Sequence, residues 1–363
     1  MIPPLPSARH VALVTPYYRP IVGGITTFVD SLARGLRSRG FEVRIWTRNG
    51  DPGPEVEVGP GEPGAFARWA RPRLAQWRPD VIHAQAHWYT LAAGYRWSGP
   101  IARRIVFTLH TDWAAPRNWI RERALRSLLH RADAITCVSE KRLASLRERF
   151  PDLHEAQVVH PGVRALPVDS ERAEQVVEEF HLRGSRPILC AVSMMVWPDK
   201  VRGLELLVRS MPLLLERHPS AALLLVGDGP LRDRVESVVD ALKVRDHVRF
   251  VGAHENPASF VLASDVSVHC SFQDAFPQSV LETVLLGRPV LINADSAAAF
   301  PGSPADLGLL PVASTPEAFA EGVERLLSDH GLWDDLASRG RRSVADRFSW
   351  ARTVDRFVDL YGV

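Results

Sequence analysis

The sequence predicts an α/β protein of two domains, each built on a doubly wound parallel sheet. Three observations carry this prediction. At 363 residues the chain is too long for one ordinary hydrophobic core, which favours two domains. Short apolar runs typical of buried strands alternate with segments of helical periodicity. This alternation lapses once, over residues 164–186, and then starts again.

The first alternation fills residues 1–163. It begins with the strand-like run "HVALVT" (10–15), followed by a loop and by "TTFVDSLARGLRSRG" (26–40), where Phe28, Leu32 and Leu36 recur at helical spacing. A helix is expected over 121–132. Further strands are expected at 42–47, 80–85, 104–110, 134–139 and 156–163.

The polar stretch 164–186, with one short helix, is expected to connect the two domains. The second domain is expected over 187–345. Its predicted strands are 187–195, 221–227, 248–252, 265–270 and 289–294, and its predicted helices include 203–219, 230–242 and 315–330. The final residues, 346–363, are predicted to form a helix that packs back on the first domain.

Composition restricts the class of protein. Hydrophobic content is 46% and charged content 24%, as in ordinary globular proteins. No apolar run approaches the ~18–20 residues that cross a bilayer. The start "MIPPLPSARH" has no signal-peptide pattern. The three cysteines are scattered, which is typical of reduced core residues. We therefore expect a cytoplasmic protein, either a monomer or a homodimer.

Charge is uneven along the chain. Residues 1–163 hold 23 Lys and Arg against 14 Asp and Glu, whereas residues 164–363 hold 21 against 28. A basic half can attract phosphates or anionic surfaces. Because the arginines are spread over several helices, we expect at most weak peripheral membrane contact and no nucleic-acid partner.

The loops that follow strands are the candidate sites, because ligands bind at the carboxyl ends of the strands in open α/β sheets. In "IVGGIT", Gly23 and Gly24 precede a helix, and helix N-terminal amides bind anions. In "SMMVWPDKVRG", Lys200 and Arg202 lie near a helix start, where the helix dipole disfavours cations. A bound polyanion would offset that cost.

The stretch "SFQDAFPQSVLETVLLGRPV" (271–290) places two carboxylates on either side of a predicted strand-to-helix corner. Pro277 suits the first helical turn and Gly287 is expected to end the helix, so Asp274 falls in the loop and Glu282 in the second turn. The arrangement suits a nucleotide sugar, with phosphates at the helix start, one acid for ribose hydroxyls and the other for the sugar ring. The alternative interpretation is a helix cap at Asp274 and a surface residue at Glu282. The other candidate donor-binding residues of this stretch are Phe276 and the three residues at the helix start, Gln278, Ser279 and Val280, whose backbone N–H groups are expected to be free.

Further candidates follow strands of the first half. His110 ends a strand in "FTLHTD", and His87, Trp88 and Trp113 follow strand ends, where an acceptor could bind. Indole faces stack on sugar or cyclitol rings, although tryptophans filling a core is an equally good interpretation. No H-E-x-x-H, C-x-x-C or D-x-D pattern occurs, which argues against a protein-held metal. We expect no cofactor and a nucleotide-diphosphate sugar as co-substrate.

Taken together, the chain resembles the retaining glycosyltransferases of family 4. The resemblance covers nearly its whole length, and the acid pair fits that family's Glu-x7-Glu motif with Asp274 in place of the first Glu. Eight landmarks occur in order: "PYYRPIVGGITTFVDSLARGLRSRGFEVRIWT", "RPDVIHAQ", "FTLHTD", "ADAITCVSE", "VVHPGV", "RGLELLVRSMPLLLERHPSAALLLVGDGP", "ASDVSVHCSFQDAFPQSVLETVLLGRPVL" and "FSW".

The resemblance implies a GT-B fold, with two Rossmann-like domains facing across a cleft, and sugar transfer with retained configuration and without a metal. It also implies roles for single residues. Glu282 would bind the ribose, Asp274 would lie against the donor sugar, and His110 would lie near the reacting sugar. The Gly23–Gly24 loop would approach the diphosphate or the acceptor.

The chain departs from the family at two places. The family's Arg-x4-Lys pair holds the diphosphate, but its Arg position falls on Met194 or Met195, and its Lys position falls on Arg202, with Lys200 two residues earlier. "HPGVR" also replaces the usual "PNGVD". The sequence leaves open whether Lys200 or Arg202 meets the diphosphate.

The function predicted is transfer of a sugar from a UDP- or GDP-sugar to the hydroxyl of a small-molecule, glycan or glycolipid acceptor. Front-side attack is favoured, with the departing phosphate as base. A nucleotide-sugar 2-epimerase of the same fold and a donor-binding protein with little activity are the alternatives. A nicotinamide dehydrogenase is disfavoured because "GDGPLR" lacks the third glycine of the dinucleotide fingerprint.

Overall fold

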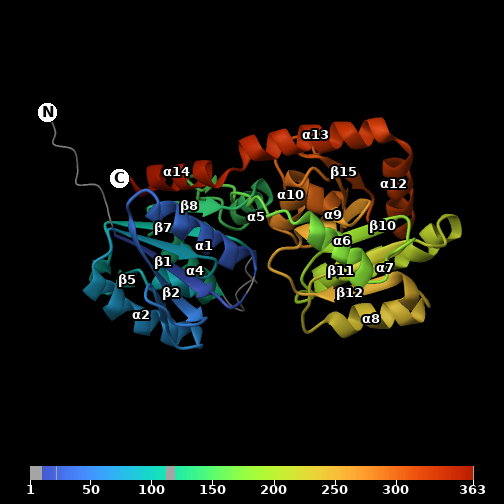
Figure 1. Cartoon of the computed structure of the whole chain (residues 1–363). Helices are drawn as coiled ribbons and strands as arrows, with labels where there is room; N and C mark the ends of the chain where they lie inside the picture. The colour runs from blue at the N-terminus through green and yellow to red at the C-terminus, as the bar shows by residue number, and fades with distance from the viewer. Residues whose placement is uncertain (1–9, 22, 112–118, 363) are drawn as a thin grey trace. The chain divides into compact units, whose positions relative to one another are not determined.

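The computed structural model describes residues 10–21, 23–111 and 119–362. The chain divides into two compact units, coloured along the sequence in Figure 1. Unit 1 comprises residues 1–162 and 350–363, and unit 2 comprises residues 163–349. Residues 164–186, expected to connect two domains, therefore belong to unit 2, where their helix α6 (Ser170–Glu179) packs against α9 (Ala258–Leu262).

Unit 1 is built on a seven-stranded parallel sheet in the order β3-β2-β1-β4-β7-β8-β9. The strands are β1 (His10–Tyr17), β2 (Glu42–Asn49), β3 (Val56–Val58), β4 (Val81–Gln85), β7 (Arg104–Leu109), β8 (Ala134–Cys137) and β9 (Gln157–Val158). Its helices are α1 (Gly24–Arg37), α2 (Pro63–Trp77), α3 (Trp88–Ala92), α4 (Trp119–Leu129), α5 (Glu140–Arg149) and α14 (Trp350–Tyr361), and β5 (Tyr95–Arg96) pairs antiparallel with β6 (Gly99–Pro100).

Unit 2 is built on a six-stranded parallel sheet in the order β12-β11-β10-β13-β14-β15. The strands are β10 (Ile188–Val192), β11 (Ala222–Val226), β12 (Val248–Gly252), β13 (Val266–His269), β14 (Val290–Asn293) and β15 (Leu309–Val312). Besides α6 and α9, the helices are α7 (Pro198–Arg217), α8 (Arg232–Ala241), α10 (Gln278–Leu285), α11 (Ala294–Ala297), α12 (Pro316–Ser328) and α13 (His330–Arg347), with short 3₁₀ turns at Arg245–His247 and Ala305–Leu307.

Both sheets are parallel and covered on two faces, as the alternation of strands and helices predicts. In each sheet the chain first winds outward in one direction and then returns to the other side of its first strand. The switch lies between β1 and β4 in unit 1, and between β10 and β13 in unit 2. The carboxyl ends of those strand pairs are where a doubly wound sheet binds ligands.

Helix α14 is part of the core of unit 1, although unit 2 separates it in sequence from the rest of that unit (Figure 1). Its Phe357 packs at 5.8 Å, edge to face, on Phe28 of α1. The Tyr361 hydroxyl lies 2.8 Å from Nδ1 of His83, a wholly buried residue of β4. The backbone carbonyl of Leu360 accepts a hydrogen bond from Arg104 Nε at 3.1 Å.

Candidate active site

Three side chains from different elements meet at the switch point of unit 2. Asp274 lies in the loop between β13 and α10 and is only 4% exposed. His269, the last residue of β13, donates from Nε2 to Asp274 Oδ2 at 2.7 Å. Lys200, in the first turn of α7, lies with Nζ 3.0 Å from Asp274 Oδ1. Both oxygens of the Asp274 carboxylate are therefore engaged.

The charge state of Asp274 follows from these neighbours. Burial by itself would raise the pKa of Asp274, but the positive charge of Lys200 and the hydrogen bond from His269 outweigh burial and hold the pKa well below its usual range. The carboxylate is therefore ionised at any ordinary pH. A buried carboxylate keeps its charge only where such partners stabilise it.

A glycine allows α7 to come close enough for this contact. A Cβ atom added at Gly203 would lie 1.9 Å from the carbonyl oxygen of Cys270, in the loop after β13. Any side chain at position 203 would push α7 away from that loop. Because Lys200 lies one turn earlier on the same helix, the close approach at Gly203 also brings the Lys200 ammonium to Asp274.

The two cations that the sequence left as alternatives have different surroundings. Lys200 contacts the buried Asp274. Arg202 is exposed; its guanidinium lies over the ring of Phe272 at 3.7 Å, and its Nη1 is 3.5 Å from Asp199. Arg202 is therefore held by its own surface partners, and Lys200 is the cation that lies at Asp274.

Helix α10 begins one residue later than the proline predicted to mark its start. Pro277 is the N-cap, Gln278 is the first helical residue, and no side chain caps the helix. The sequence predicted open amides at Gln278, Ser279 and Val280. The Val280 amide instead donates to the Pro277 carbonyl at 3.1 Å, which closes the first turn.

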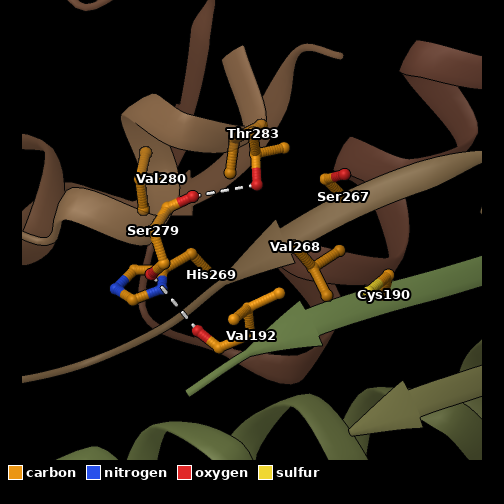
Figure 2. Close-up of a pocket in the computed structure, with 9 residues that line it drawn as sticks. Cys190, Val192, Ser267, Val268, His269, Ser279, Val280 and Thr283 are labelled. Carbon is orange, nitrogen blue, oxygen red and sulfur yellow. Dashed lines mark hydrogen bonds between the residues drawn. The ribbon is translucent and has the colours of Figure 1, made fainter. Parts of the chain in front are cut away.

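Phe276 and Ser279 anchor the corner between loop and helix. The Phe276 side chain packs against Phe300 and Phe348, with ring centroids 5.3 and 5.6 Å away, so it faces the core. Ser279 Oγ donates to the Val192 carbonyl at 3.4 Å, and Thr283 Oγ1 donates to the Ser279 carbonyl at 2.9 Å (Figure 2). These contacts line a small pocket between β10, β13 and α10, whose walls are Cys190, Val192, Ser267, Val268, His269, Ser279, Val280, Thr283 and Val290.

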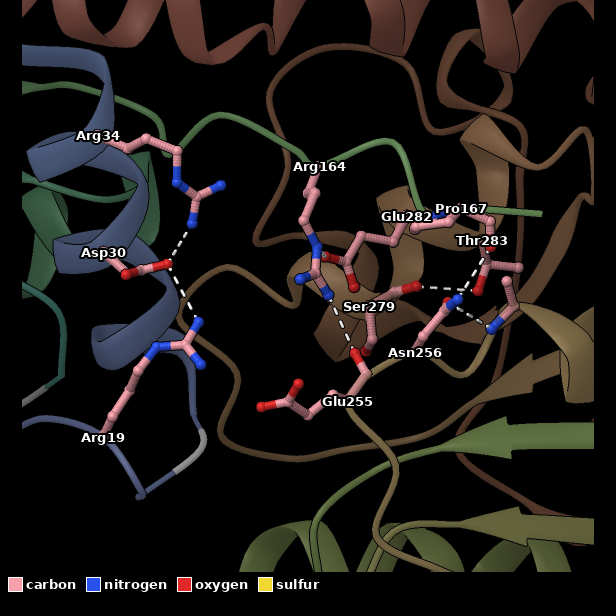
Figure 3. Close-up of polar contacts among 11 residues, drawn as sticks. Arg19, Asp30, Arg34, Arg164, Pro167, Glu255, Asn256, Ser279, Glu282 and Thr283 are labelled. Atoms are coloured by element: carbon pink, nitrogen blue, oxygen red, sulfur yellow. Dashed lines mark hydrogen bonds and ion pairs between the residues drawn. The ribbon is translucent and has the colours of Figure 1, made fainter. Parts of the chain in front are cut away.

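Glu282 lies in the second turn of α10, where the sequence placed it, and its side chain is only 12% exposed. Burial raises the pKa of Glu282, and the nearby Arg164 opposes that rise. Arg164 Nε is 3.9 Å from Glu282 Oε1, and Figure 3 shows the two side chains next to each other. Glu282 is thus a buried helix residue, and the interpretation of it as a solvated surface residue is wrong.

In unit 1, the predicted residues lie at the carboxyl ends of β4 and β7. His110 follows β7 and is buried; its Nε2 donates to Gln85 Oε1 at 2.9 Å. Burial, aided by nearby His87, lowers the pKa of His110 to about 3, so the imidazole is neutral at ordinary pH. His87 stacks on Tyr89 at 5.4 Å, and burial lowers its pKa as well.

The remaining predicted residues of unit 1 have fewer contacts. Trp88 begins α3 and is 47% exposed. Gly24 begins α1 with Gly23 as its N-cap, and an added Cβ at either glycine would meet nothing within 4 Å. Local packing therefore does not require glycine at these positions. Trp113 lies outside the described residues.

Two residues of this region were not singled out from the sequence. His269 ends the run "DVSVHC", and its position at the carboxyl end of a strand was the signal that could have identified it. Arg164 was visible only as the unusual last residue of "HPGVR". Periodicity places Arg164 outside any strand or helix, so its contact with Glu282 required the tertiary structure.

Comparison with known proteins agrees with this architecture. Residues 22–165 match the family described as Glycosyltransferase Family 4, and residues 178–343 match Glycosyl transferases group 1. A D-inositol 3-phosphate glycosyltransferase of Salinispora arenicola is 27% identical over 99% of this chain and 93% of its own length. A GDP-mannose-dependent phosphatidylinositol monomannoside mannosyltransferase of Mycolicibacterium smegmatis is 27% identical over 75% of each chain. The structure of HepE from Anabaena in complex with UDP-glucose superimposes with a TM-score of 0.81 at 17% identity, over 97% of this chain and 99% of HepE.

The two parallel α/β sheets and the superposition on HepE show the GT-B fold, and the family matches define a glycosyltransferase. The family matches together span most of the chain. The chain belongs to glycosyltransferase family 4 and uses a nucleotide-sugar donor. Among the described helices, none has the length and apolar composition that a bilayer crossing needs.

Proposed function

We propose that the protein is a retaining, metal-independent glycosyltransferase that moves a sugar from a UDP- or GDP-sugar to a hydroxyl acceptor. Unit 2 binds the donor at the carboxyl ends of β10 and β13. The observation that carries this proposal is the buried ion pair between Asp274 and Lys200, formed at the switch point and close in sequence to the buried Glu282. Two buried acids, one of them paired with a partly exposed lysine, are an arrangement that gathers at functional sites.

We assign each part of the donor to the residue whose chemistry suits it. Glu282 accepts hydrogen bonds from the ribose hydroxyls. Lys200 and the positive end of the α10 dipole stabilise the diphosphate, whose negative charge grows as it departs. Asp274 holds the Lys200 ammonium in place and supplies a negative charge beside the sugar as the sugar becomes oxocarbenium-like. Because its two oxygens are held by Lys200 and His269, Asp274 acts through its charge and not as a covalent nucleophile.

The acceptor is a small molecule, a glycan or a glycolipid, and unit 1 binds it through the residues that follow β4 and β7. Trp88 offers an exposed indole face for a ring. The neutral His87 and His110 offer hydrogen bonds without charge. In the attack we propose, the acceptor hydroxyl approaches the donor sugar from the side of the leaving diphosphate. The diphosphate takes the proton of that hydroxyl.

A nucleotide panel tests the donor. The named relatives include a GDP-mannose-dependent enzyme and a protein crystallised with UDP-glucose, so UDP and GDP are the first two ligands to compare. We expect one of them to raise the thermal unfolding temperature, because a ligand that binds only the folded state stabilises it.

A product assay with the matching nucleotide sugar then separates transfer from epimerisation. Release of nucleoside diphosphate that requires an added acceptor indicates a transferase, and conversion of the sugar without acceptor indicates a 2-epimerase.

A donor-binding protein with little activity is the second candidate. It is favoured by the methionines at 194 and 195, where the family has the arginine of its diphosphate clamp. A methionine thioether has no charge, so neither residue can substitute for that cation. Donor binding without turnover, in the presence of varied acceptors, would establish this alternative.

Chelation of divalent metals is expected to leave turnover unchanged. The counter-charge for the diphosphate comes from Lys200 and the start of α10, and among the described residues no group of three or more His, Cys, Asp or Glu side chains is placed to hold a metal. Turnover would be measured with and without EDTA. Loss of activity in EDTA, with recovery on addition of Mn²⁺ or Mg²⁺, would contradict metal-independent transfer.

A further inference from the structure

Arg164 has an unusual position for an arginine at the start of unit 2. Its Nη2 donates to the backbone carbonyl of Glu255 at 3.0 Å, and its Nε faces Glu282 Oε1 at 3.9 Å (Figure 3). The Nε group is buried and, within the part of the chain that the structure describes, has no hydrogen-bond partner. The distance to Glu282 is too long for a hydrogen bond but short enough for a strong attraction between opposite charges.

The loop that accepts the hydrogen bond of the Arg164 guanidinium is itself fixed in place. Glu255 lies in the loop between β12 and α9, and the same loop is fastened to the Arg164 segment a second time, because Asn256 Nδ2 donates to the Pro167 carbonyl at 2.9 Å. Asn256 Oδ1 in turn accepts from the Ala258 amide at 3.2 Å, at the start of α9. The arginine therefore reaches Glu282 from a fixed backbone and not as a freely moving surface side chain.

The carboxylate of Glu282 needs such a partner. Among the described residues, Arg164 is the charged group that lowers the pKa of Glu282 against the effect of burial. To bind two neighbouring hydroxyls, a carboxylate must stay ionised, since protonation removes an acceptor, and it must keep one orientation. Burial works against the first condition, because it favours the neutral form of the carboxyl group.

We propose that Arg164 is a positioning residue that fixes Glu282, ionised and oriented, for the ribose hydroxyls of the donor. The inference rests on the proposed function, in which Glu282 binds the ribose. It assigns the "HPGVR" departure a role in recognition of ribose as opposed to deoxyribose, and it predicts that Arg164 acts on ribose through Glu282 and not on the phosphates.

The test compares each nucleoside diphosphate with its 2′-deoxy and 3′-deoxy forms, by calorimetric titration with UDP and GDP. The wild-type protein is expected to bind the ribose form about ten- to a hundredfold more tightly, the value of a hydrogen bond to a charged group. In Arg164→Gln, whose amide can still donate to the Glu255 carbonyl, this preference is expected to fall to within about threefold of unity, as in Glu282→Gln. Arg164→Lys, which restores the positive charge, is expected to recover most of it.

Arg183→Met is the matched control, because Arg183 pairs with Glu178 on the exposed surface of the same unit. Its ribose preference should equal that of the wild type.

A loss of affinity in Arg164→Gln that is equal for ribose and deoxyribose forms would overturn the inference. It would mean that Arg164 contacts the phosphates or only supports the fold. An unchanged preference in Arg164→Gln would overturn it too, while leaving the proposed function intact. Failure of the wild-type protein to bind either UDP or GDP would overturn the proposed function itself, and the inference with it.

Discussion

Replacing Glu282 by alanine is expected to lower the affinity for the nucleoside diphosphate by about one to two orders of magnitude. The substitution removes hydrogen bonds between ribose hydroxyls and a charged group, each worth roughly 1.5–3 kcal/mol. The loss should be equal for the nucleotide sugar and for the bare diphosphate, because both carry the same ribose. Arg164 would also lose the partner that lies 3.9 Å from its buried Nε.

Calorimetric titration of the variant with UDP, GDP and the active nucleotide sugar measures this effect. Glu321→Ala is a suitable control, since Glu321 is an exposed glutamate on helix α12 of the same unit. The control should bind as the wild type does. Unchanged affinity in Glu282→Ala would show that the buried carboxylate does not contact the nucleotide.

Asp274→Asn is expected to fail in the opposite way, with nearly normal binding of the bare diphosphate and a loss of about a hundredfold or more in kcat. An amide of the same size can still accept from the Lys200 ammonium, so the lysine stays at its place. What disappears is the negative charge beside the reacting sugar, and a preorganised charge or dipole at a developing charge is worth about 10²–10³ in rate. Since the lost charge would also repel phosphate, no loss of diphosphate affinity is expected.

The measurement pairs a steady-state assay with titration by the bare diphosphate on one preparation. Asp274→Ala supplies the contrast: it releases Lys200 and His269 together, so it should weaken diphosphate binding as well as turnover. Full turnover in Asp274→Asn would reduce Asp274 to a structural anchor. Weak diphosphate binding in that variant would show that the amide cannot hold Lys200.

Much of the fold follows from local sequence pattern. Apolar runs such as "HVALVT" and "AALLLV" became central strands β1 and β11, and Gly287, with φ of 78°, follows α10 where the sequence placed its end. Helix α2 was not identified, because Pro72 and Pro63 both lie within "PGAFARWARPRLAQW" and interrupt its helical pattern. Pro63 instead occupies the first helical position, where its missing N–H costs nothing.

The candidate site was predictable in its parts but not in its contacts. Spacing placed Asp274 in a loop and Glu282 in a helix, yet it could not say that Lys200 and not Arg202 reaches Asp274. That outcome depends on the ring of Phe272, which lies under the Arg202 guanidinium, and on the absence of a side chain at Gly203. Both are effects of tertiary packing, to which periodicity and propensity are insensitive.

The position of α14 in unit 1 affects the order in which the two units can fold. Unit 2 is one uninterrupted segment, whereas unit 1 needs both the first 162 residues and the residues from Trp350 onward. During synthesis Phe28 and His83 therefore lack their contacts with Phe357 and Tyr361 until the whole of unit 2 has been made. Domains that are contiguous in sequence usually fold from the N-terminal one onward. Here the second unit can reach its native core while the first is still incomplete, so a nascent chain arrested before residue 350 would expose hydrophobic surface in unit 1 alone.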